Sequence, residues 1–307
     1  MDRRTFLAAA FGTPALAALV IACGDDSTTP LRPRNTGDSV PGADGSTTSS
    51  PSTSLAPSVP GIPHPTGADD VVLRFGYEGG FVAPDTLFDR TPALLISGDG
   101  RVFSSGVVPA VFPGPLVQVM DVRSISEQGM QAVLSAAVAA DLLRTPPSYD
   151  LPSGVGIADA ADTVVTFAAK GAVFEHRAYA LDVTASDGVA ETSPRSVLTK
   201  FVAKLGDLPA MVGAGQLGAE AAFAPAAYRV RATADQSQPS TDQPAPTLVA
   251  WPTEVGVALK DATGCVRVDA TKVADLFAKA NQLTYFTEAG ITYRLAVAPV
   301  LPGDPAC

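Results

Sequence analysis

Short runs in which apolar and polar residues alternate begin near residue 70, and this period of two predicts β-strands. Two of these runs flank Gly98-Asp99-Gly100, and two others flank Lys170-Gly171. Such turn residues accept a positive φ, so both places are expected hairpins. The expected strands cover 71–75, 93–97, 101–103, 163–167, 173–181, 228–231, 248–251, 284–287 and 293–297.

Three other stretches carry apolar residues three and four positions apart, as on one face of a helix. Ser124 and Glu127 resemble a capping box at the start of the first stretch. Pro194 stands at the start of the second, where its fixed φ favours a helix, and Asp269 is the expected N-cap of the third. The expected buried positions are Met130, Val133, Leu134, Ala137 and Val138, then Val197, Phe201 and Leu205, then Val273, Leu276, Phe277 and Ala280.

Both halves of the folded part therefore have the order strand, strand, helix and glycine-turned hairpin. This order predicts an α+β fold made of two small antiparallel sheet-plus-helix units, residues 69–208 and 209–307. Because the element order repeats while the residues hardly do, a degenerate internal duplication is expected.

The N-terminus has a different pattern, an apolar run over residues 8–21 behind Arg3 and Arg4. Fourteen apolar residues are too few for a helix across a hydrocarbon core of about 30 Å. A short apolar run behind positive charges is typical of a secretory signal peptide, which we place at residues 1–22.

Two motifs in this segment resemble known export signals. Arg3-Arg4-Thr5-Phe6-Leu7 is similar to the twin-arginine motif, and Val20-Ile21-Ala22-Cys23 resembles the lipobox of bacterial lipoproteins. The lipobox resemblance implies that Cys23 is diacylated and becomes the mature N-terminus. Asp2 and Ala8 depart from the usual twin-arginine pattern, so the general secretory route stays open.

Residues 23–68 follow as a polar segment. Of the 45 residues after Cys23, 29 are Ser, Thr, Pro or Gly, which is too little apolar surface to offset the entropy of ordering. We expect the lipidated cysteine to be followed by a disordered tether.

Composition narrows the possible functions. Apolar residues make up 46% of the 307 residues, enough for a packed core, and 31 Asp and Glu outnumber 21 Lys and Arg. An acidic body does not favour nucleic acid, and it is repelled by anionic lipid, so acyl chains must hold the protein at a membrane. The chain has only two histidines, which argues against most histidine-based catalysis and against a histidine-rich metal site.

Cys265 and Cys307 remain once Cys23 is assigned to lipid. An even pair in an exported chain favours a disulfide, which here would fix the C-terminal residue. Two unrelated thiols are the alternative, and two sulfurs without a nearby histidine cannot complete a zinc site.

Other candidate motifs favour structural roles. Gly213-Ala214-Gly215-Gln216-Leu217-Gly218 matches the dinucleotide fingerprint, but no strand is expected before it, and Pro225 shortens any helix after it. His176 lies in a strand pattern with Phe174 and Ala178 on its face, without a nucleophile motif nearby. We expect a loop and a structural histidine, and no cofactor or metal.

Two further groups could contribute chemistry. Asp159 and Asp162, with Asp150 upstream, are the densest carboxylates in a predicted loop and could serve hydrolysis or hold Ca²⁺. Solvated loop charges are the alternative. Residues 77–81, Tyr-Glu-Gly-Gly-Phe, could form a contact surface or an ordinary strand end.

The body also resembles uncharacterised secreted lipoproteins of high-GC Gram-positive bacteria, through residues 98–102 and through residues 299–303 before a terminal cysteine. This resemblance implies no activity. We therefore expect a lipoprotein anchored at the extracytoplasmic face of the cell membrane. Its expected role is non-catalytic binding of an envelope protein or cell-wall component, and the alternative is an envelope hydrolase that uses Asp159 and Asp162.

Overall fold

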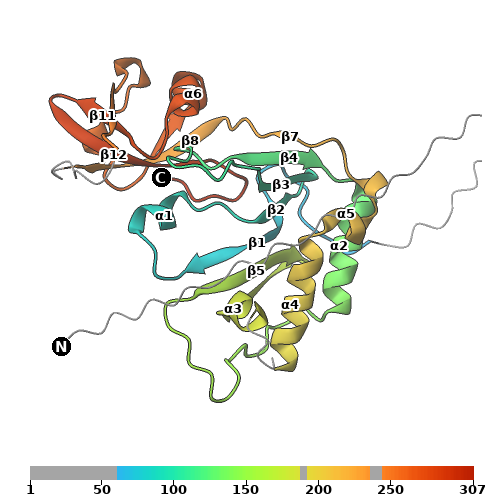
Figure 1. Ribbon diagram of the computed structural model, residues 1–307. Helices are drawn as coiled ribbons and strands as arrows, with labels where there is room; N and C mark the ends of the chain where they lie inside the picture. Colours follow the sequence, from blue (N-terminus) through green and yellow to red (C-terminus); the bar gives the residue numbers. More distant parts are fainter. Residues whose placement is uncertain (1–60, 187–191, 236–243) are drawn as a thin grey trace, which may run out of the picture. The chain divides into compact units, whose positions relative to one another are not determined.

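The computed structural model describes residues 61–186, 192–235 and 244–307. Two sheets organise these residues (Figure 1). The signal peptide, Arg3, Arg4, Cys23 and most of the expected tether lie outside the described residues. No helix among the described residues is long and apolar enough to cross a membrane.

The first sheet has seven strands in the order β6-β5-β1-β2-β3-β4-β7, with antiparallel neighbours throughout. The hairpins expected at Gly98–Gly100 and Lys170-Gly171 are confirmed as the β2–β3 and β5–β6 turns. Its strands are β1 (Val71–Gly79), β2 (Leu94–Ser97), β3 (Arg101–Ser105), β4 (Met120–Ser124), β5 (Ala161–Ala169), β6 (Ala172–Tyr179) and β7 (Ala221–Ala222).

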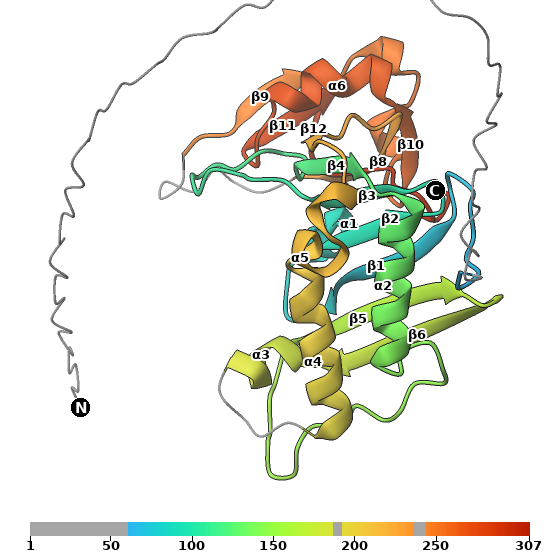
Figure 2. The same cartoon turned by 90° about the vertical axis from the view of Figure 1, so that its right-hand side faces the viewer.

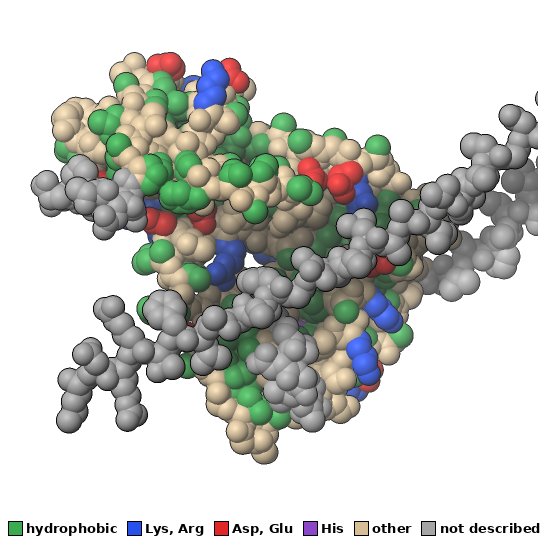
Figure 3. All heavy atoms as spheres, viewed as in Figure 1, with side chains coloured by type: hydrophobic (Ala, Val, Ile, Leu, Met, Phe, Trp, Pro, Cys, Tyr) green, Lys and Arg blue, Asp and Glu red, His purple; other side chains and the backbone are tan. Residues whose placement is uncertain are grey.

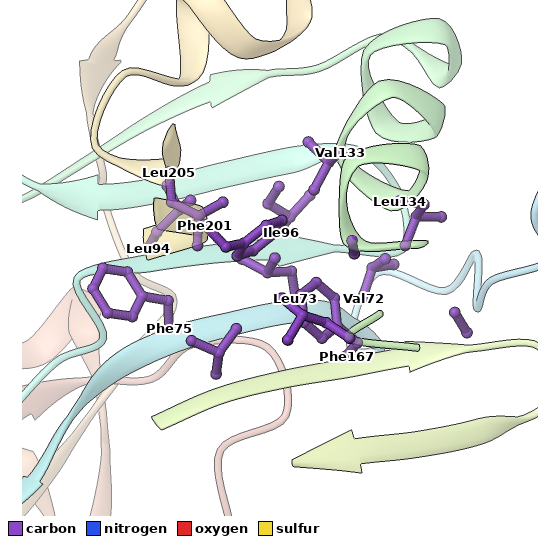
Figure 4. Close-up of a cluster of buried hydrophobic side chains, with 14 of the residues drawn as sticks. Val72, Leu73, Phe75, Leu94, Ile96, Val133, Leu134, Phe167, Phe201 and Leu205 are labelled. Carbon is purple, nitrogen blue, oxygen red and sulfur yellow. The ribbon is translucent and has the colours of Figure 1, made fainter. Parts of the chain in front are cut away.

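Two long helices, α2 (Glu127–Ala139) and α4 (Ser193–Leu205), cover one face of this sheet (Figure 2). The strands direct alternate side chains toward the helices, so Leu73 and Phe167 lie in the core beside Leu134 and Phe201 (Figure 4). The shorter helices are α1 (Pro84–Asp89), α3 (Leu181–Ser186) and α5 (Leu208–Val212), and a 3-10 turn, η1, covers Ala214–Gln216.

The second sheet has five strands in the order β10-β8-β12-β11-β9. Helix α6 (Ala270–Lys279) contributes Val273 and Phe277 to its core, beside Trp251 and Phe286. The strands are β8 (Ala227–Ala234), β9 (Thr247–Ala250), β10 (Val266–Asp269), β11 (Thr284–Glu288) and β12 (Ile291–Pro299), with 3-10 turns η2 (Thr253–Val255) and η3 (Leu259–Asp261) between β9 and β10.

The α+β class is confirmed, while the internal duplication is not. The strand orders of the two sheets differ, and β9 runs parallel to β11 although an antiparallel sheet was expected. Strand β7, in the predicted second unit, pairs with β4 of the first sheet. Residues 209–222 thus belong to the first sheet and its helices, and separate folding of two units stays a prediction.

Some local predictions were wrong by a few residues. Ser126, not Ser124, caps α2 and accepts a hydrogen bond from the Gly129 amide, because Ser124 still pairs in β4. Val138 and Val197 are exposed, because they lie on the sides of α2 and α4 that face away from the sheet. The Asp269 cap of α6 is confirmed through its bond to the Thr271 amide.

The folded body also begins before residue 69. The Ile62 amide donates to the Gln131 side chain, and the Lys170 amide donates to the Pro63 carbonyl. Ile62 packs against the first core. Residues 61–68 were expected in the tether because prolines and glycine dominate their composition, but one apolar side chain and its neighbouring backbone groups suffice to dock them.

Candidate functional site

A cleft of about 370 Å³ lies on the face of the first sheet opposite α2 and α4. Its floor comes from β1 and β5, where Arg74 stands opposite Thr166 and Gly76 opposite Val164. Helix α1 forms a wall through Leu87 and Phe88, and β8 contributes Arg229. Because β1 alternates, Leu73 and Phe75 enter the core while Arg74 enters the cleft.

Three arginines, Arg74, Arg90 and Arg229, line this cleft. Arg74 Nη1 donates to Asp304 Oδ1 at 3.3 Å, and Arg229 Nε lies 3.7 Å from the other oxygen of that carboxylate. Arg90 Nη1 donates to the carbonyls of Tyr77 and Gly79 at 3.1 and 3.0 Å. Figure 3 shows Lys and Arg atoms inside a hollow on this side of the molecule. The cleft is therefore cationic in a chain whose net charge is −10.

The hydrogen-bonding capacity of these arginines is largely unused. A guanidinium has five N–H donors, yet Arg229 Nε is buried with no hydrogen-bond partner among the described residues. Arg195, which is fully buried in the first core, instead donates to three carbonyls and to the Thr184 hydroxyl. The N–H groups of Arg195 thus find acceptors within the protein, whereas the cleft arginines have N–H groups without an acceptor among the described residues.

An aromatic side chain organises the wall. The ring centroid of Phe88 lies 5.7 Å from the Arg229 guanidinium carbon and 4.7 Å from that of Arg231. Arg231 is itself bonded to Asp85 at 2.9 Å, which ties α1 to β8. Burial raises the pKa of Asp89 at the end of α1, and the nearby Asp85 charge adds to this effect.

Neither of the two carboxylates named from the sequence lines the cleft. Asp162 lies on β5, where its Oδ2 accepts from Arg177 Nη1 at 3.1 Å. Asp159 precedes the strand, and its carbonyl accepts from the Phe81 amide at 3.1 Å. The described residues hold no group of three or more His, Cys, Asp or Glu side chains that could bind a metal ion.

Arg177 is the centre of a surface network on the same face. Its Nη2 lies 2.6 Å from Glu78 Oε2 and 3.2 Å from Glu175 Oε1, in addition to its bond to Asp162. The hydrogen bond to Glu78 is the main reason that the pKa of Arg177 is raised. This network links β1, β5 and β6. It also pairs the Glu78 carboxylate, which borders the cleft, with Arg177 rather than with a cleft arginine.

Residues 77–81 end β1 at the rim of the cleft. Gly79 and Gly80 have φ values of 66° and 84°, which explains the pair of glycines. Tyr77 lines the cleft, whereas the Phe81 side chain is 87% exposed. The expected contact surface is thus a turn that places one aromatic residue in the cleft and one in solvent.

His176 has a structural environment. Its Nε2 donates to the Leu142 carbonyl at 2.7 Å, which leaves Nδ1 to accept from the Tyr149 hydroxyl at 2.6 Å. Burial lowers the pKa of His176 and raises the pKa of Tyr149 to about 12. Both groups are therefore neutral at pH 7, and the histidine joins β6 to the segment after α2.

The glycine-rich motif and the cysteine pair are the two remaining candidates from the sequence. Gly213–Gly218 forms a turn that contains η1, between α5 and β7, with a helix before it as expected. Cys265 and Cys307 lie at disulfide distance, with sulfurs 2.00 Å apart, in the predicted pairing.

Comparison with protein-family models, curated proteins and solved structures finds no match to the chain. The function of the cleft is therefore inferred from the geometry and charge of its lining residues. Sequence reasoning missed Arg74, Arg229 and Asp304, which are 75 or more positions apart and meet only through packing of the two sheets. Arg74 and Arg229 did show one signal, because each is a charged residue within an apolar strand pattern.

Proposed function

We propose that this protein is a lipid-anchored binding protein at the extracytoplasmic face of the cell membrane. In this proposal Cys23 carries the acyl chains, and the arginine cleft takes an anionic component of the envelope, either a cell-wall component or a group on another envelope protein. The anchor is inferred from the lipobox and twin-arginine resemblances of residues 1–23.

One observation supports the binding role most strongly. Arg74, Arg90 and Arg229 face one cleft, and Asp304 is the one carboxylate among the described residues within 4.0 Å of any of them. Guanidinium groups recognise carboxylates and phosphates through paired hydrogen bonds. Keeping like charges together costs free energy, and an anionic ligand would recover it.

Binding is favoured over hydrolysis by the state of the carboxylates. Glycoside hydrolysis needs two carboxyl groups on opposite sides of the scissile bond. Here Glu78 and Asp162 are bonded to the same arginine, Arg177, which holds both charges in a strand-to-strand network. The hydrolase alternative at Asp159 and Asp162 gains no geometric support from this arrangement.

Site-specific photocrosslinking in intact envelope tests the binding role. A photoreactive residue at Leu87, which is 50% exposed and lines the cleft, should capture an envelope component. The matched control is Val138, which is 41% exposed on α2. Adducts that form at position 87 and disappear with Arg74→Gln support the proposal. Identical adducts from both positions, or none from position 87, would contradict it.

Fractionation tests the anchor separately. Cys23→Ala should release the protein from membranes or leave the uncleaved precursor, because a chain with a net charge of −10 is repelled by anionic lipid and needs the acyl chains to stay at the membrane. A mature-sized Cys23→Ala protein that still needs detergent for release would overturn the lipid anchor.

A further inference from the structure

We infer that the ligand of the arginine cleft carries a dianionic group attached to an apolar or aromatic body. This inference rests on the proposed binding function and names the chemical class that the cleft would select. Three features of the cleft support it: the charge of its lining, the free N–H donors of its arginines and its apolar wall.

The charge balance favours a dianion. Three arginines line the cleft, and Asp304 compensates one of them, with its carboxylate between Arg74 and Arg229. Glu78 also lines the cleft, but its carboxylate is bonded to Arg177 at 2.6 Å. Asp89 acts on Arg90 from beyond 4.0 Å, so within that distance one carboxylate faces three guanidinium groups among the described residues. A group with two negative charges would pair with the other two.

The donors favour a group with several acceptor oxygens. Among the described residues, Arg74 uses one side-chain hydrogen bond, at 3.3 Å, and Arg229 uses none. Arg90 directs Nη1 to two carbonyls of β1 and forms no ion pair within 4.0 Å among the described residues. The donors come from three segments of the chain: β1, β8 and the segment after α1.

The wall of the cleft favours an apolar body beside that group. Leu87, Phe88 and Val164 line it, and the Phe88 ring already packs against Arg229. Inorganic phosphate would leave this surface unused, whereas an aromatic or alkyl substituent would cover it. Phosphate monoesters and dicarboxylates both combine a double negative charge with such a body, and they are the two sources of the inferred chemistry.

Calorimetric titration of the purified mature protein in detergent, at low ionic strength, tests this inference. Phenyl phosphate and isophthalate are the dianionic probes, benzoate is the monoanionic control, and inorganic phosphate lacks the apolar body. We expect at least one dianionic aromatic probe to bind about tenfold or more tightly than both benzoate and inorganic phosphate. The tighter of the two dianions identifies the source, phosphate monoester or dicarboxylate.

The variants locate the binding. Arg74→Gln and Arg90→Gln, at partly exposed positions, should each weaken the preferred probe about tenfold, because each removes a charged donor. Arg144→Gln removes the same charge from an exposed ion pair with Asp141 elsewhere on the body, and it should leave affinity within about twofold. Melting by circular dichroism verifies that each variant is folded.

Three results would overturn the inference: benzoate or inorganic phosphate binding as tightly as both aromatic dianions, no probe binding at millimolar concentration, or Arg144→Gln weakening binding as much as Arg74→Gln. The photocrosslinking at Leu87 separates this failure from failure of the function. If the probes fail while the arginine-dependent adduct at position 87 forms, the ligand class is wrong and the binding function stands. If both fail, the proposed function falls as well.

Discussion

Removing the Cys265–Cys307 pair should destabilise the protein through its unfolded state. The two cysteines are 42 positions apart, with Cα atoms 5.0 Å from each other. In the chain-entropy treatment, a crosslink closing a loop of this length stabilises the native state by at most about 4 kcal/mol at 25 °C. The double variant Cys265→Ala/Cys307→Ala loses this contribution.

The native C-terminal segment has other contacts that persist without the crosslink. The Val300 amide donates to the Ala227 carbonyl, Leu301 is buried, and Asp304 lies between Arg74 and Arg229. The double variant should therefore fold, and the loss should appear as a lower free energy of unfolding rather than as a changed native spectrum.

Urea unfolding measures the effect with two probes. Trp251 is the one tryptophan of the chain, and it is buried beside Phe277 and Phe286 in the second sheet, so its fluorescence reports that core. Far-ultraviolet circular dichroism reports both sheets. With a urea dependence near 2.5 kcal/mol per molar, a loss of 4 kcal/mol lowers the midpoint by about 1.5 M. Reduced wild-type protein is the control, and its midpoint should match that of the variant.

An unchanged urea midpoint in the double variant would contradict stabilisation through the unfolded chain, because the disulfide would then not restrict that chain. Loss of structure in the variant without urea would refute it differently, by showing that the bond holds the native fold. The two probes also test the predicted units: separate fluorescence and dichroism transitions support folding units on either side of residue 208, and coincident transitions contradict them.

Single groups give four further predictions. Burial holds the pKa of His176 below 6.5 in the folded protein, so in the unfolded chain this histidine takes up a proton at a higher pH. The free energy of unfolding should therefore fall as the pH drops below 6.5, by at most about 1.4 kcal/mol per pH unit. His176→Phe should flatten this slope in urea titrations at pH 5.5 and 7, and an unchanged slope would contradict a buried, neutral His176. Asp269→Ala should cost about 1 kcal/mol in thermal melting by removing the N-cap of α6, and an effect below about 0.3 kcal/mol would contradict a capping role. Arg195→Met should cost about 3 kcal/mol or more, because it leaves buried carbonyls without their donor, and wild-type stability of this variant would count against that network. Replacing Arg3-Arg4 with Lys-Lys should sharply reduce export by the twin-arginine route, whereas normal export would indicate the general secretory route.

The periodicity of the chain predicted the elements well but not their arrangement. Alternation located β1, β5 and β6, and it placed His176 on one strand face with Phe174 and Ala178; in the structure His176 and Ala178 are buried. The order of strands in each sheet, including the parallel β9–β11 pair, depends on long-range pairing that no local pattern encodes.

The candidate site was the part least accessible from sequence. The predicted disulfide pairing followed from counting cysteines, whereas the cleft needs Arg74, Arg229 and Asp304 from three distant segments. Asp159 and Asp162 are close in sequence, yet neither lines the cleft, and Asp162 is bonded to Arg177. The arginines converge because the two sheets pack, which is a tertiary effect.

Binding of an anionic ligand in the arginine cleft can be observed at the arginines themselves, through their side-chain Nε–H signals. In ¹H–¹⁵N spectra of the mature protein titrated with the preferred aromatic dianion, the Arg74 and Arg90 Nε–H signals should move most, because these partly exposed side chains line the cleft. The Arg195 signal should stay in place, since that side chain is fully buried in the first core. Unchanged signals of Arg74, Arg90 and Arg229 at saturating probe, or equal movement of Arg195, would contradict binding in the cleft.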